Sequence, residues 1–73
     1  MNTIDEYLQR TLAEDQKFLQ ERIAELDRIK SLYPDQIDTP EVAGLQEIID
    51  DLKKNIFTTE KLLKQRQKRG SNS

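Results

Sequence analysis

The apolar positions in the second half of the chain recur in alternating steps of three and four residues. This spacing is typical of a coiled-coil seam, because about 3.5 residues per repeat keep one side of a helix turned toward a partner. Apolar residues in the first half also return every seven positions. The pattern therefore predicts two long amphipathic helices. The second-half positions are Val42, Leu45, Ile49, Leu52, Ile56, Thr59 and Leu63, and the first-half positions are Leu12, Leu19, Leu26 and Tyr33.

Both prolines fall between these two patterns and set the predicted boundaries. Pro34 disfavours helical geometry at the preceding residue, so the first helix is expected to stop there. Thr39 followed by Pro40 is typical of an N-cap with proline at the first helical position. The chain is therefore expected to form one helical domain over 1–69, with helices over 4–33 and 40–69, a loop over 34–39, and a disordered tail over 70–73.

A connection this short makes the two helices antiparallel neighbours. Folding the chain at residues 36–38 places Leu26 near Ile49 and Leu19 near Ile56. The predicted fold class is therefore all-α, an antiparallel and coiled-coil-like two-helix hairpin.

The apolar residues of each helix spread over an arc wider than a partner helix can cover. At 100° per residue each arc spans roughly 160°. The excess would form an exposed apolar strip, and such strips usually mark an interface. We expect a homodimer that forms a four-helix bundle, with binding to a different protein as the competing solution. The residues assigned to this interface are Ile4, Phe18, Leu32, Ile48 and Leu62.

Four polar residues, Asp15, Arg22, Asn55 and Thr59, interrupt the apolar arcs, and the antiparallel register brings them to one level. They can form a buried polar core layer that fixes the register. Alternatively, Asp15 and Arg22 extend to the rim of a loosely covered face. The sequence leaves both interpretations open.

Two residues stand out without belonging to a seam. Gly44 lies near the start of the second helix, where it is either exposed or allows another chain to approach closely, and we favour the exposed position. Phe57 lies among charged residues, where it is either a partner anchor or an ordinary exposed side chain, and we favour the latter.

The residue types present restrict the chemistry. The 73 residues include no Cys and no His, so a disulfide and any metal site that needs Cys or His ligands are excluded. Glu47, Asp50 and Asp51 cluster on the second helix, where solvated surface acids usually lie. We therefore expect no enzyme activity, no catalytic residue, no bound metal and no cofactor.

Charge is unevenly distributed along the chain, although 12 basic and 14 acidic residues give a net charge of only −2. All 14 acids and seven of the bases lie in residues 1–60, for a net charge of −7, whereas residues 61–73 carry +5. The basic end can contact a polyanion or an acidic partner, or it can neutralise the acidic first turn of the folded hairpin. Its basic residues are Lys61, Lys64, Arg66, Lys68 and Arg69.

These features favour a binding protein over an enzyme. We expect a non-enzymatic protein–protein interaction module, an adaptor, inhibitor or small subunit, that pairs with itself, with another protein, or with both. The alternative is a nucleic-acid-binding regulator that uses the basic end of the second helix. The sequence contains no long apolar stretch and no signal-peptide pattern at its start, so we expect a soluble cytoplasmic protein without membrane contact.

Overall fold

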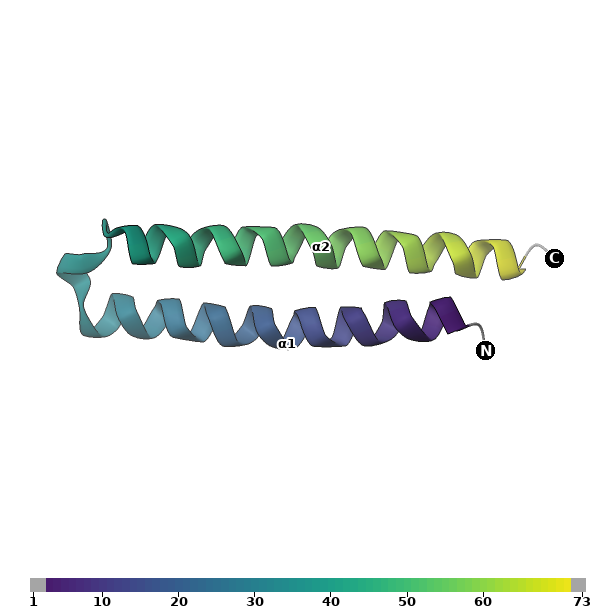
Figure 1. The fold of residues 1–73 in the computed structure, drawn as a ribbon, viewed down its shortest axis with the longest axis horizontal. Coiled ribbons are helices and arrows are strands. Elements are labelled where there is room, and N and C mark those ends of the chain that lie inside the picture. Colours follow the sequence, from purple (N-terminus) through teal and green to yellow (C-terminus); the bar gives the residue numbers. More distant parts are fainter. Residues whose placement is uncertain (1–2, 72–73) are drawn as a thin grey trace.

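The computed structural model describes the backbone of residues 3–71 and the side chains of residues 3–68. Helix α1 spans Thr3–Leu32, a short 3-10 turn η1 spans Pro34–Gln36, and helix α2 spans Pro40–Ser71. Figure 1 shows the two helices side by side and antiparallel, with both chain ends at the same end of the rod. The rod measures 57 × 15 × 14 Å. The predicted all-helical hairpin of two packed helices is confirmed.

The helix bounds differ slightly from the predicted ones. Helix α1 begins and ends one residue earlier than predicted, and α2 continues to Ser71, while 72–73 of the predicted tail lie outside the described residues. The seven-residue repeat assigned Tyr33 to the seam, but this residue lies outside the helix, with φ −134° and ψ 65°. Its side chain is exposed. The reason is Pro34, whose ring excludes helical geometry at the residue before it.

Thr39 connects the turn to the start of α2. The Val42 N–H donates a hydrogen bond of 3.4 Å to the Thr39 hydroxyl oxygen, which satisfies an N–H group that has no partner inside the helix. The Thr39 hydroxyl itself donates to the carbonyl oxygen of Gln36 at 2.9 Å. The predicted N-cap at Thr39, with Pro40 as the first helical residue, is confirmed.

The core lies close to the turn. Leu26 of α1 packs in one cluster with Val42, Leu45 and Ile49 of α2, and Ile49 is only 2% exposed. Leu19 and Ile29 pack against this cluster as half-buried neighbours, and Ile56 and Thr59 continue the buried side of α2. The predicted seam of α2 is therefore the side of the helix that α1 covers.

Gly44 supplies a direct test of local helix stability. A Cβ atom added at Gly44 would meet no other atom within 4 Å, so nothing in the hairpin requires glycine there. We expect Gly44→Ala to stabilise the hairpin by about 0.5–1 kcal/mol, since glycine carries an entropic cost inside a helix. Thermal unfolding followed by circular dichroism measures this effect. A lower melting temperature would instead indicate that another chain approaches Gly44 closely.

Candidate interaction surfaces

The five residues predicted to form the interface are all exposed in the hairpin. Ile4, Phe18, Leu32, Ile48 and Leu62 are between 44% and 63% exposed. Their exposure follows from their positions, because Phe18, Ile48 and Leu62 directly precede the seam positions Leu19, Ile49 and Leu63. Ile4 precedes Asp5, which lies seven residues before Leu12, and Leu32 is the last residue of α1. A single neighbouring helix covers the seam and leaves these side chains at its edge.

These five residues lie on one side of the hairpin and define what we call the apolar strip. Ile4 of α1 and Leu62 of α2 line the same hollow, of about 270 Å³, together with Arg66. In an antiparallel pair, the residues that directly precede the seam positions of both helices fall on the same side. Ile4, Phe18, Ile48 and Leu62 occupy that position, and Leu32 follows Phe18 by two heptads at the end of α1. The strip therefore follows one face of the rod.

The order of residues along the strip follows from an ion pair that joins the helices. Asp5 of α1 pairs with Arg66 of α2, so these two positions lie opposite each other. Starting from this pair and moving toward the turn at 1.5 Å per residue, Leu62 lies between Ile4 and Phe18 along the rod. By the same count, Ile48 lies between Phe18 and Leu32. Residues from α1 and α2 therefore alternate along the strip, at intervals of about 7 to 14 Å.

The opposite face of the rod is polar. Each of its members directly follows one of the seam positions Leu8, Asp15, Arg22, Ile29, Leu45, Leu52 and Thr59, and all of them are exposed. Ile23 is the one apolar side chain among those described on this face. The polar members are Gln9, Gln16, Lys30, Gln46, Lys53 and Glu60. The face of the strip also carries Thr11, Glu25, Glu41 and Asn55, which precede seam positions as well. The apolar residues are nevertheless concentrated on this face, whereas the opposite face is almost entirely polar.

One exposed apolar residue extends the strip beyond the predicted set, and a second lies in the turn. Tyr7 is 66% exposed and lies one helical turn from Ile4, and Ile37 is 44% exposed in the turn between the helices. Tyr7 was visible in the sequence as a member of the wide arc of the first helix. Ile37 had no such signal, because its position depends on the conformation of the turn rather than on helical periodicity.

The predicted polar core layer is not assembled within one hairpin. Thr59 is buried, but its hydroxyl donates to the carbonyl oxygen of Asn55 in its own helix at 2.9 Å, and the Asn55 side chain is exposed. Arg22 is half-buried and pairs with Glu25 of its own helix at 3.1 Å. Asp15 is half-buried. A polar side chain that finds its partner one turn away needs none from the opposite helix.

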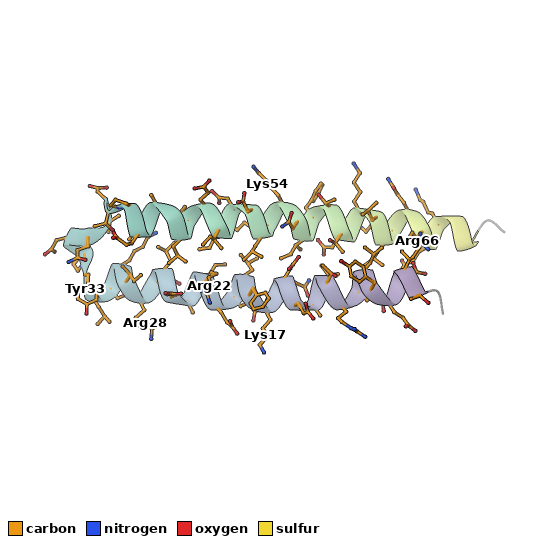
Figure 2. All side chains as sticks on the ribbon, viewed as in Figure 1. Lys17, Arg22, Arg28, Tyr33, Lys54 and Arg66 are labelled. Atoms are coloured by element: carbon orange, nitrogen blue, oxygen red, sulfur yellow. The ribbon has the colours of Figure 1, made fainter. Side chains whose placement is uncertain are left out.

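The basic end divides into two parts with different surroundings. Arg66 turns toward α1 and donates from Nε to the Asp5 carboxylate, and Figure 2 shows its side chain between the two helices. Lys61 and Lys64 face outward and line a hollow with Phe57 and Glu60. Lys68 is exposed, and the Arg69 side chain lies outside the described residues. Neutralisation of the acidic first turn therefore involves Arg66, whereas Lys61, Lys64 and Lys68 remain exposed.

Comparisons of the chain with protein-family models, with curated proteins and with solved structures give no match. Within the described residues, no group of three or more carboxylates has the arrangement of a metal site. Neither helix, over the same residues, is long and apolar enough to cross a membrane.

The Asp5–Arg66 pair provides a measurable coupling between the two ends of the chain. Both side chains are about one-third exposed, so the ion pair is partly screened by water. We expect a double-mutant cycle with Asp5→Asn and Arg66→Gln to give a coupling of about 0.2–1 kcal/mol that decreases at high salt. Urea unfolding of the four proteins measures the coupling. A coupling near zero at low salt would contradict a stabilising role for the pair.

Proposed function

We propose that this protein is a non-enzymatic interaction module that pairs with a second copy of itself through the apolar strip. The strip is the single observation that carries the proposal, because five exposed apolar residues share one face of a hairpin whose opposite face is polar. Two hairpins that meet on this face make a four-helix bundle. The outer surfaces of the bundle are then available to a further protein, so that the module acts as an adaptor, inhibitor or small subunit.

The surface area of the hairpin supports a second copy as the occupant of the strip. The chain exposes 5986 Å² for a mass of 8.6 kDa. A compact monomer of that mass exposes about 4,700 Å², so this hairpin exposes about 1,300 Å² more. A stable interface buries about 800 Å² from each partner, which fits within that excess. A two-helix core is also a weak source of stability for a chain of this length.

A double variant of the apolar strip tests the dimer, and a double variant with the same types of substitution elsewhere on the surface is its control. We expect sedimentation at micromolar concentration to give about twice the chain mass of 8.6 kDa for the unaltered protein. Phe18→Gln combined with Ile48→Gln removes two apolar anchors from the interface, so it weakens dimerisation about 100-fold or more. Both residues are exposed in the single hairpin, so its helical content is expected to persist.

The control for this experiment removes the same two side-chain types from other surfaces. Phe57→Gln combined with Ile23→Gln also changes one exposed phenylalanine and one exposed isoleucine, but neither belongs to the strip. This variant is expected to remain dimeric. A compact, well-folded monomer of the unaltered protein at micromolar concentration, or equal loss of dimer in both double variants, would contradict the proposal.

A nucleic-acid-binding regulator is the second candidate, because Lys61, Lys64 and Lys68 form an exposed basic group near the end of α2. Two observations act against it. Arg66 is paired with Asp5. Residues 1–60 carry a net charge of −7, which repels polyanions.

Binding to a nucleic acid has a distinct salt signature. It would weaken steeply as salt rises, because each neutralised phosphate releases counterions. We expect no retention of the protein on immobilised single-stranded DNA at low salt. Salt-sensitive retention that disappears on charge reversal at Lys64, Arg66, Lys68 and Arg69 would establish the second function instead.

A further inference from the structure

The outer side of α2 carries a basic face that the apolar strip does not use. Its members are all exposed, and at 100° per residue they fall within an arc of about 80°. Between residues 53 and 68 the chain has five lysines and one acidic residue, Glu60. The members of this outer basic face are Lys54, Phe57, Lys61, Lys64 and Lys68.

Phe57 is an apolar residue in the middle of these lysines. Its side chain is 66% exposed, as much as any large apolar side chain that the structure describes. Together with Lys61 and Lys64 it lines a shallow hollow of about 310 Å³. An exposed aromatic ring beside a hollow resembles the anchors that contribute most to protein interfaces. The surrounding ammonium groups add charge to this apolar anchor.

The outer basic face stays accessible when the apolar strip is covered. Lys54 points away from α1, whereas Lys17 points away from α2 on the other side of the rod (Figure 2). Around the axis of α2, the face lies about 140° from Ile48 and Leu62. A second copy seated on the strip therefore leaves the lysines and Phe57 exposed to a third molecule.

We propose that the outer basic face binds an acidic amphipathic segment of another protein, with an apolar side chain on Phe57 and carboxylates on Lys61 and Lys64. This inference rests on the proposed function as an interaction module, and it adds the surface and the chemistry of the partner. Lys54, Lys61 and Lys68 recur every seven residues, or two helical turns. An acidic helix lying along α2 presents carboxylates at the same interval.

The composition of the face favours an acidic protein segment over a nucleic acid. Phe57 stands alone, whereas single-stranded nucleic acids are bound by several aromatic side chains on which successive bases stack. Glu60 in the same hollow and the charge of −7 on residues 1–60 oppose any polyanion. A protein segment can offset this repulsion with one basic side chain on Glu60 and an apolar side chain on Phe57, whereas the phosphates of a nucleic acid cannot. Arg66 contributes no free guanidinium to this face because it is paired with Asp5.

Fluorescence anisotropy with a synthetic peptide tests the inference. The probe is a fluorescein-labelled peptide of about 18 residues, or five helical turns, with glutamates along one side and a central leucine pair. We expect saturable binding to the full chain that shifts the amide resonances of residues 54–64 in an NMR spectrum. Lys61→Glu combined with Lys64→Glu should weaken binding at least tenfold, and Phe57→Gln about tenfold.

A matched charge control separates site binding from general attraction. Lys17→Glu combined with Lys30→Glu changes the net charge by the same amount, but both residues belong to α1. This variant should bind the peptide within about twofold of the unaltered protein, since the screening length in ordinary buffer is about 10 Å. Circular dichroism of each variant checks that its helices are intact.

The remaining measurements separate this inference from the proposed dimer. Peptide binding by the monomeric Phe18→Gln, Ile48→Gln variant supports the outer basic face independently of self-association. A dimer that does not bind the peptide overturns this inference and leaves the dimer standing. Equal binding of a scrambled peptide of the same composition also overturns it. Preferential binding of an oligothymidylate of equal charge overturns it in favour of nucleic acid.

Discussion

The packing of Leu26 against Val42, Leu45 and Ile49 next to the turn is the contact on which the hairpin depends. These four residues, with Ile56 and Thr59, are the buried residues of the described part of the chain. One buried leucine contributes about 2–5 kcal/mol, which is comparable with the whole stability that a chain of this size draws from one core. Because each helix shields only one stripe of the other, most remaining apolar side chains stay at the surface.

The sequence was sufficient to predict the fold because the determining signals are local and repetitive. The three-and-four-residue spacing of α2 predicted which side is buried, and Thr39 followed by Pro40 predicted where α2 begins. The heptad repeat wrongly assigned Tyr33 to the seam, whereas Pro34 correctly predicted that the first helix stops at this point. Thr59 shows a similar limit, since periodicity predicted its burial but not that its hydroxyl would bond to its own helix.

The candidate surfaces were predictable in part. The members of the apolar strip followed from the width of the apolar arcs, and the structure adds that the strip has a polar face opposite to it. The Asp5–Arg66 pair was not predictable as a specific contact, because it depends on the helix register to within a single turn. That pair separates Arg66 from its basic neighbours. The sequence had already placed Phe57 among charged residues, and the structure adds that this ring and its lysine neighbours are exposed around one hollow.

The position of the core near the turn has a consequence for the way the rod opens. From the turn outward, the seam changes from buried Leu26 and Ile49 to half-buried Leu8 and Leu63. Closing a short loop costs little entropy, so contacts beside the turn form early and persist longest. We therefore expect the two helices to separate first at the end far from the turn and last beside the turn. At the end of the rod far from the turn, the Asp5–Arg66 ion pair that joins the helices is partly screened by water, and we expect amide hydrogens there to exchange with solvent first.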